Sequence, residues 1–347
     1  MRRLLAGVAI AGLTVLAAGC GSSAASSGSA PAKKVVLRLG FLENITHAPA
    51  LVGVKDGFFT KNLGKNVTLQ LYPYSTGTEE ATALLAGQLD AAYVGPNPAI
   101  NTWQKSSGFA IKVISGVASG GAELVVKPGI TSASQLKGQK LASPSLGNTQ
   151  DVSLRYWLKT QGLTTTPTGG GDVPITPITP NSAAVLQFAS GQIAGGWEPA
   201  PYDVEMVAEG GHVLVNEASL WPGGQFVTAL LVVTQSFLAA NPTVVSDLLK
   251  ANIEAISYIA SQPSAAEAAA NAELATLTGK GLKSAVLAAS FAQVTFTDDP
   301  IESSLIADAS HAVSLGLLKP VSNLQGIFDL GPLNALLKAD GKPTIGS

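Results

Sequence analysis

The chain has 347 residues, of which 21 are basic and 23 acidic, and this balance gives no support for nucleic-acid binding. A chain of this length usually exceeds one hydrophobic core, so we expect two lobes. The single cysteine cannot form an internal disulfide, and three scattered histidines do not make a zinc site. We therefore expect neither a metal nor a cofactor.

The first residues have the pattern of a secretory signal. A basic start at residues 1–3 precedes an uncharged apolar run at 4–18, which is too short for a stable membrane span. Residues 16–20 resemble a bacterial lipobox, with the leucine one position earlier than the pattern prefers. We predict a signal peptide over 1–19 and lipidation of Cys20, which would anchor an extracytoplasmic protein to the cell membrane. An ordinary signal peptide with a stray cysteine is the alternative.

The next stretch, 20–34, is predicted to be a flexible tether, because residues 21–32 are Gly, Ser, Ala and Pro without a large apolar side chain. After it, strands and helices alternate at the spacing of a parallel sheet. Strands are expected at 35–41, 67–72, 109–114, 123–127, 139–142 and 226–233. Helices are expected at 50–56, 131–136, 151–160, 242–259, 264–277, 282–291 and 300–315, and from residues 75 and 181. Residues 162–180 are rich in Gly, Pro and Thr and give no clear pattern.

One unit occurs twice. The pattern of residues 84–98 predicts the end of an apolar helix, a Gly-Gln turn, a short buried strand and a loop with proline. Residues 186–199 have the same elements in the same order. Two copies predict two similar lobes. Ligands of open α/β sheets bind outside the carboxyl ends of the strands, so two such lobes would form a binding cleft between them.

The segments 40–41, 47–50 and 55–59 resemble the substrate-binding proteins of bacterial ABC importers for nitrate, sulfonates, taurine and thiamine-precursor pyrimidines. Residues 84–96 and 124–142, and the return at 228–242, are similar to the same family. The resemblance implies an α/β, two-lobed type II periplasmic-binding fold, in which each lobe is a mainly parallel sheet flanked by helices and two strands form the hinge. It also implies a monomer that binds a small-molecule solute without chemistry and delivers it to an ABC permease and its ATPase.

We place the first lobe at 35–126 and 230–347 and the second at 127–229, with hinge crossings near Val126 and Val232. An enzyme is not expected. The chain has no Gly-x-Ser-x-Gly, no phosphate-binding Gly-x-x-x-x-Gly-Lys-Ser/Thr and no His-Glu-x-x-His motif.

Five loops are expected to face the cleft, at 44–49, 75–78, 95–98, 143–149 and 197–201. Four of them precede helices, whose first N–H groups favour an anion, and none contains Lys or Arg. Simple helix capping is the alternative role for their Ser, Thr and Asn residues. The candidate ligand-binding residues are Asn44, His47, Ser75, Thr76, Gly77, Gly95, Pro96, Asn97, Ser143, Gly147, Asn148, Thr149, Trp197 and Glu198.

Three of these candidates have open alternatives. His47 could be a helix-entry residue without ligand contact, Trp197 could pack in the core, and Glu198 could be a surface charge. A cleft-facing Glu198 would favour a solute with an amine. We expect a small anionic or zwitterionic solute of the sulfonate, taurine or nitrate class. A thiamine-precursor pyrimidine or other nitrogen heterocycle, or a surface interaction protein on the same fold, is the alternative.

Overall fold

The computed structural model describes residues 34–346. The predicted signal peptide, the lipidation of Cys20 and nearly all of the tether lie outside the described residues. Within 34–346, none of the helices combines the length and the apolar character that crossing a bilayer requires.

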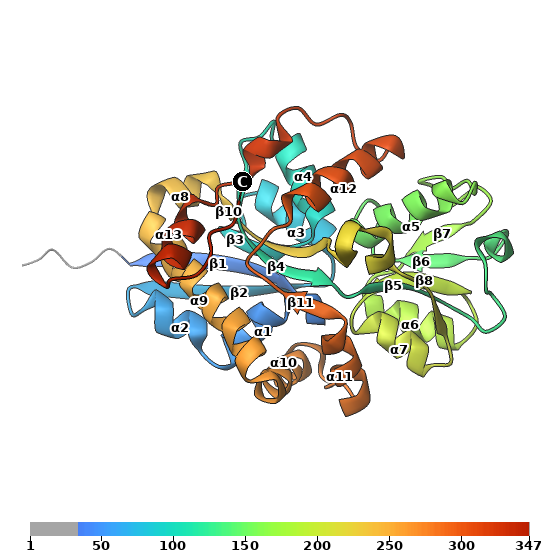
Figure 1. Ribbon diagram of the computed structural model, residues 1–347, viewed down its shortest axis with the longest axis horizontal. Helices are drawn as coiled ribbons and strands as arrows, with labels where there is room; N and C mark the ends of the chain where they lie inside the picture. The colour runs from blue at the N-terminus through green and yellow to red at the C-terminus, as the bar shows by residue number, and fades with distance from the viewer. Residues whose placement is uncertain (1–33, 347) are drawn as a thin grey trace, which may run out of the picture. The chain divides into compact units, whose positions relative to one another are not determined.

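The first lobe is built on a six-stranded sheet in the order β11-β4-β10-β3-β1-β2 (Figure 1). β1 pairs in parallel with β2 and β3, whereas β10 runs antiparallel to β3 and β4, and β11 antiparallel to β4. The bounds are β1 Val35–Leu42, β2 Val67–Tyr74, β3 Ala91–Val94, β4 Ile111–Gly120, β10 Val227–Thr234 and β11 Val294–Phe296.

The second lobe has a five-stranded sheet in the order β7-β6-β8-β5-β9. Again three strands are parallel, and β5 runs antiparallel to β8 and β9. The bounds are β5 Ala122–Val126, β6 Leu141–Ser143, β7 Ile175–Pro177, β8 Gly195–Pro199 and β9 His212–Asn216. Read from the parallel edge, β2-β1-β3-β10-β4 of the first sheet corresponds to β7-β6-β8-β5-β9 of the second. Each sheet is therefore mixed, with its parallel part confined to three strands.

Helices cover both faces of each sheet (Figure 1). In the first lobe, α1, α2, α9 and α10 share one core cluster and α3, α4 and α12 another. In the second lobe, α5 packs on one face and α6 with α7 on the other. The bounds are α1 Ala48–Lys55, α2 Phe58–Leu63, α3 Gly77–Leu85, α4 Pro96–Lys105, α5 Thr149–Thr160, α6 Asn181–Ala189, α7 Tyr202–Ala208, α8 Gln235–Ala240, α9 Pro242–Ser261, α10 Pro263–Thr278, α11 Ser284–Ala292, α12 Glu302–Ser314 and α13 Gly331–Ala339.

The two copies of the repeated unit make the same backbone contacts. The N–H of Asp90 donates to the carbonyl of Arg38 in β1 at 2.9 Å, and the N–H of Ala194 donates to the carbonyl of Lys140, just before β6, at 2.8 Å. The predicted internal repeat is therefore present in three dimensions, as α3–β3 in one lobe and α6–β8 in the other.

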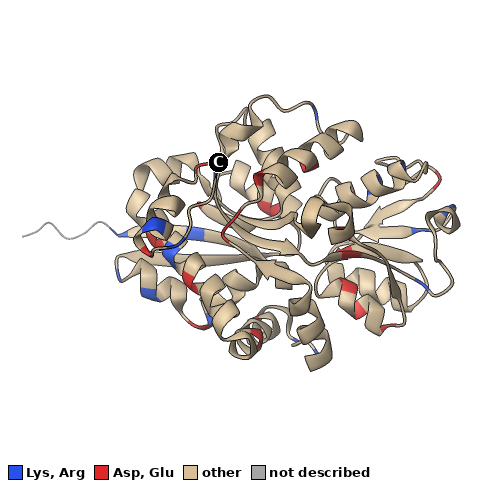
Figure 2. Cartoon of the chain, in the orientation of Figure 1, with Lys and Arg blue, Asp and Glu red and all other residues tan. Residues whose placement is uncertain are grey.

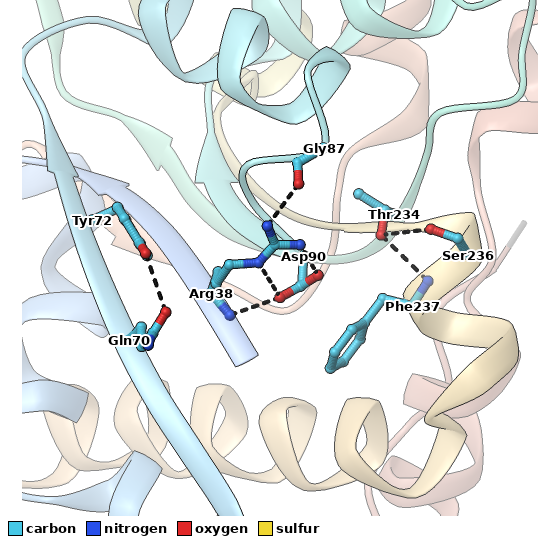
Figure 3. A network of polar contacts seen from close by, with 8 residues as sticks. All are labelled: Arg38, Gln70, Tyr72, Gly87, Asp90, Thr234, Ser236 and Phe237. Carbon is cyan, nitrogen blue, oxygen red and sulfur yellow. Dashed lines mark hydrogen bonds and ion pairs between the residues drawn. The ribbon is translucent and has the colours of Figure 1, made fainter. Parts of the chain in front are cut away.

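The first copy carries an additional ion pair (Figure 3). Nη2 of Arg38 lies 2.7 Å from Oδ1 of Asp90, and Nη1 donates to the carbonyl of Gly87 at 2.7 Å. Gly87 has φ +66°, a conformation that glycine adopts without strain. This network fixes the turn before β3, and so the place where β3 delivers its following loop.

The chain passes between the sheets twice. β4 of the first sheet is followed at once by β5 of the second, with Gly120 and Gly121 at the junction. The return runs through residues 217–226, between β9 and β10. We therefore propose lobe boundaries at Gly121 and within 217–226, in place of boundaries after residues 126 and 229.

Candidate functional site

A small cavity lies where the carboxyl ends of the parallel strands of both lobes meet. Residues that follow β1, β2 and β3 of the first lobe and β6 and β7 of the second contribute to its wall, together with Pro199 at the end of β8. Its volume is about 20 Å³, which is room for about one water molecule. The lining residues are Leu42, Asn44, Thr46, His47, Ser75, Thr76, Gly77, Gly95, Pro98, Pro144, Asn148, Thr149, Gln150, Asn181, Pro199 and Thr228.

The structure brings eight of the fourteen predicted site residues to this wall: Asn44, His47, Ser75, Thr76, Gly77, Gly95, Asn148 and Thr149. Two of them are also helix caps, which is the alternative role that the sequence predicts for Ser, Thr and Asn in these loops. Oγ1 of Thr76 accepts the N–H of Glu79 at 3.4 Å, and Oδ1 of Asn148 accepts the N–H of Asp151 at 2.9 Å. A capping role and a place on the cavity wall are therefore compatible.

Four of the remaining candidates have contacts elsewhere. Pro96 and Asn97 are buried in the first turn of α4, where Nδ2 of Asn97 donates to the carbonyl of Asp308 at 3.4 Å. The hydroxyl of Ser143 and the N–H of Gly147 donate to the carboxylate of Asp151 at 2.7 and 2.9 Å. These residues shape the loops behind the wall and do not line the cavity.

Trp197 lies in the core of the second lobe, with no exposed surface. Its indole N–H donates to Oε2 of Glu217 at 2.7 Å, and its ring packs against that of Trp157. This placement matches the core-packing alternative, because a ring between two buried partners presents no face to a solute.

Glu198 is also fully buried, and neither carboxylate oxygen has a hydrogen-bond partner within residues 34–346. Burial, followed by repulsion from Asp203, raises the pKa of Glu198 well above its usual value. The neighbouring Pro199, and not Glu198, lines the cavity.

Three helices begin at the cavity wall. α3 starts at Gly77, α5 at Thr149 and α6 at Asn181, and the first N–H groups of a helix have no partner inside it. α4 contributes less than the sequence suggested. Its first and third residues are Pro96 and Pro98, which have no N–H. The second lobe therefore supplies two helix N-termini with free N–H groups, those of α5 and α6. The first lobe supplies one, that of α3.

None of the lining side chains is charged at neutral pH. The backbone N–H of Leu42 donates to Nδ1 of His47 at 3.1 Å, so Nε2 carries the ring hydrogen. Burial lowers the pKa of His47 to about 3. Figure 2 shows an acidic segment but no basic one where β4 passes into β5. A bound anion would accordingly be held by neutral donors and helix starts.

Sequence reasoning missed several lining residues, including Thr46, Gln150 and Asn181. Asn181 stands at the start of the helix that is expected from residue 181, and its sequence context gives no sign of a place at the cavity. The loop that holds it follows β7, a strand of three residues inside the unassigned stretch 162–180. Gln150 stands beside two predicted residues, and the sequence carries no sign of which way its amide faces.

The lobes are in contact at several points. The hydroxyls of Thr78 and Ser145 are 2.8 Å apart, and the hydroxyl of Tyr202 donates to the carbonyl of Glu43 at 2.8 Å. At the α5–α12 side the ring of Tyr156 stacks on that of His311, with centroids 3.6 Å apart. These contacts and the small cavity describe a closed cleft.

A larger groove of about 990 Å³ lies on the first lobe, between the end of α4 and residues 316–326. Its lining includes the start of β4 and not the carboxyl ends of the parallel strands, so its position is not that of a ligand site in an open α/β sheet. Among residues 34–346, no cluster of His, Cys, Asp and Glu could hold a metal ion.

The sequence profile described as the NMT1-like family matches residues 30–275. A search of curated proteins finds no match. The alkanesulfonate-binding protein SsuA from Xanthomonas axonopodis pv. citri, bound to MOPS, is similar in structure with a TM-score of 0.70 and 16% identity, over 86% of this chain and 99% of that chain.

Two further solved structures are similar. The periplasmic aliphatic sulphonate-binding protein SsuA from Escherichia coli has a TM-score of 0.67 and 19% identity, over 84% of this chain and 97% of that chain. The periplasmic nitrate-binding protein NrtA from Synechocystis PCC 6803 has a TM-score of 0.71 and 15% identity, over 90% and 92%. These similarities confirm the predicted two-lobed periplasmic-binding fold.

Proposed function

We propose that this chain, which belongs to the NMT1-like family, is the extracytoplasmic solute-binding component of an ABC importer. Its solute is a small oxyanion, of the class that includes nitrate and alkanesulfonates, held between the lobes. The observation that carries the proposal is the cavity at six strand ends, lined by uncharged hydrogen-bond donors and three helix starts. The structural relatives named above bind sulfonates and nitrate, which supports the same class here.

The function needs no chemistry of the chain itself. No nucleophile paired with a base lines the cavity, and His47 uses one ring nitrogen to accept a backbone N–H. We therefore propose a binding protein and not an enzyme, acting as a monomer with an ABC permease and its ATPase as partners. Lipidation of Cys20 would hold it at the outer face of the cell membrane. Cys20→Ala should then release the protein from the membrane fraction, and retention there would contradict the anchor.

A thermal-shift screen tests the binding function. Nitrate, an alkanesulfonate, taurine and an aminopyrimidine cover the candidate classes. A solute present at 100 times its dissociation constant adds about 2.7 kcal/mol to the stability of the folded state. We expect the oxyanions to raise the melting temperature and the aminopyrimidine to leave it unchanged, because no aromatic side chain other than His47 lines the described cavity. A chain that responds to none of the four would favour an interaction protein on the same fold.

The second candidate solute is one that bears an amine, such as taurine. A substitution of Glu198 tests whether this side chain binds the amine. Glu198→Gln replaces the carboxyl group with an amide of the same shape. If Glu198 has no part in binding, the affinities for taurine and for a plain alkanesulfonate should both change by less than about threefold, well under the value of one charge-assisted hydrogen bond. A selective loss of taurine in calorimetry would instead assign the amine to Glu198.

A further inference from the structure

We propose that the two lobes present hydrogen-bond donors to the same end of the solute, through His47 in the first lobe and Gln150 in the second. The inference rests on the proposed solute-binding function and specifies the solute further. The end that enters the cleft must be a fully ionised, acceptor-only oxyanion, without a hydroxyl, an amine or an amide N–H.

In the second lobe, a relay that begins at the backbone fixes the direction of Gln150. The N–H of Asp151 donates to Oδ1 of Asn148 at 2.9 Å, so the other end of that amide is its Nδ2 donor. Nδ2 in turn donates to Oε1 of Gln150 at 3.0 Å. The oxygen of Gln150 is thus engaged. Its Nε2 has no partner within residues 34–346, and the side chain lines the cavity.

In the first lobe, a single backbone N–H determines which ring nitrogen of His47 is the donor. Leu42 donates to Nδ1 at 3.1 Å, which leaves the ring hydrogen on Nε2. The ring is buried and lines the cavity, and no other hydrogen bond to it is present in the described part of the chain. Two backbone N–H groups, one in each lobe, therefore set two cavity side chains as donors.

The other polar side chains of the wall leave few free acceptors. Oδ1 of Asn44 accepts the hydroxyl of Thr46 at 2.7 Å, and the hydroxyl of Thr228 donates to the carbonyl of Gly120 at 2.8 Å. Three further groups can accept. The hydroxyls of Ser75 and Thr149 have no hydrogen bond among the described residues, and Oδ1 of Asn181, which is buried, has no partner there either. A hydroxyl or amine of a solute that lies against His47 and Gln150 would still meet N–H groups, because both of these side chains present donors.

Because His47 and Gln150 both present donors, a property we call the donor polarity of the cavity, the affinities for two solutes of the same shape should differ strongly when only one of them is acceptor-only. A donor buried opposite another donor loses its hydrogen bond and pays its desolvation cost. A charge-assisted hydrogen bond corresponds to roughly 10- to 150-fold in affinity. Methanesulfonate offers three acceptor oxygens, whereas methanesulfonamide has the same shape but carries an N–H₂ group. We expect the protein to bind methanesulfonate more tightly by at least that factor.

A substitution at Asn148 can reverse the direction of the Gln150 amide without changing Gln150 or His47 themselves. In Asn148→Asp the new carboxylate still caps α5, because Asp is as good an N-cap as Asn. Both of its oxygens are acceptors, so Gln150 must turn its Nε2 towards residue 148 and leave Oε1 facing the cavity. Asn148→Ser is the matched control. It keeps the cap but neither fixes nor reverses Gln150.

The experiment measures the affinities of methanesulfonate and methanesulfonamide by calorimetry on the wild type and both variants. We expect Asn148→Asp to weaken methanesulfonate by at least about 10- to 150-fold and to tighten methanesulfonamide, which is neutral and not repelled by the new charge. Asn148→Ser should weaken methanesulfonate by less and should not tighten methanesulfonamide. Equal affinity of the wild type for both probes, or an equal loss of both in Asn148→Asp, would overturn the donor polarity alone. Failure of the wild type to bind any oxyanion would overturn the proposed function together with it.

Discussion

Individual residues at the cavity owe their properties to neighbours that the sequence does not reveal. His47 was identified from the sequence, but its neutral state follows from burial and from the N–H of Leu42. Gln150 was missed because its direction depends on Asn148 and, behind it, on the N–H of Asp151. Residue type and loop position are visible in a sequence, whereas the direction of an amide or imidazole depends on three-dimensional contacts.

Solute binding should be insensitive to pH, and His47 is the reason. Its pKa of about 3 keeps the imidazole neutral from pH 5 to 8. The dissociation constant of nitrate or methanesulfonate, both fully ionised over this range, should change by less than about threefold between pH 8 and 5. A tightening of tenfold or more at pH 5 would show that His47 binds as a cation.

Gly95 allows the loop after β3 to approach the start of α5. A Cβ at Gly95 would lie 2.7 Å from Oγ1 of Thr149 in the other lobe, although the backbone of Gly95, at φ −69°, suits any residue. Gly95→Ala should therefore hinder closure and weaken solute binding by roughly 10-fold, which is 1–2 kcal/mol of overpacking.

A double-mutant cycle separates this clash from other effects of the alanine. In a Thr149→Ala background the opposing side chain is gone, so Gly95→Ala should cost less than about 0.5 kcal/mol there. The same loss in both backgrounds would mean that the two residues do not meet in the bound state. Thermal unfolding of the four proteins checks that each is folded.

At the scale of elements, the long or strongly patterned segments were predicted well. Strands β1, β2 and β10 and helices α5, α9 and α12 lie within a few residues of their expected positions. The elements that were not predicted include β7, β9, β11, α7, α8 and α13. The three strands are only three to five residues long. So short a segment shows little periodicity, and its pairing in the sheet, not its own sequence, makes it a strand.

One buried carboxyl joins two elements of the second lobe, α5 and β8, to the return connection. Glu217, in the turn after β9, accepts the hydroxyl of Ser153 in α5 and the indole N–H of Trp197 in β8, both at 2.7 Å. Burial raises the pKa of Glu217 to about 7, and the hydrogen bonds oppose that rise. The carboxyl group is therefore more readily protonated in the folded chain than in the unfolded one.

The raised pKa of Glu217 makes the stability of the folded state depend on pH. Between the unfolded pKa of about 4.5 and the folded value of about 7, the folded state binds more protons, so its stability falls as the pH rises. The difference corresponds to about 3 kcal/mol. Glu217→Gln resembles the protonated acid and should make the fall in stability between pH 5 and 8 shallower, as measured by urea unfolding. The remaining fall comes from other buried carboxyl groups with raised pKa values, such as Glu198 and Asp203. The exposed Glu209→Gln is the control and should keep the wild-type slope, and an unchanged slope in Glu217→Gln would refute the assignment.

At the scale of the whole molecule, the lobes of residues 34–346 are closed on a cavity of about 20 Å³. A nitrate or sulfonate is larger than one water, so entry requires the lobes to separate at the two crossings, near Gly121 and within 217–226. Small-angle scattering should show a smaller radius of gyration with a saturating oxyanion than without solute. Identical profiles at proven saturation would mean that the lobes do not move.

The fold class and the two-lobed organisation were predicted from the repeated unit and the family resemblance together. The exact crossings were not, because β4 and β5 form one nearly continuous extended stretch whose division at Gly120 and Gly121 depends on which sheet each strand joins. The sequence shows where extended segments are but not which neighbours they pair with.

The most direct test of oxyanion binding in the cleft is calorimetric titration with methanesulfonate and with nitrate, comparing two matched variants. Gln150→Leu removes a donor from the cleft, and Gln104→Leu makes the same change in the outer groove of the first lobe. We predict one oxyanion bound per wild-type chain, an affinity at least about tenfold weaker in Gln150→Leu, and no change in Gln104→Leu. The absence of oxyanion binding by the wild type, or binding lost in Gln104→Leu and retained in Gln150→Leu, would contradict a solute site between the lobes.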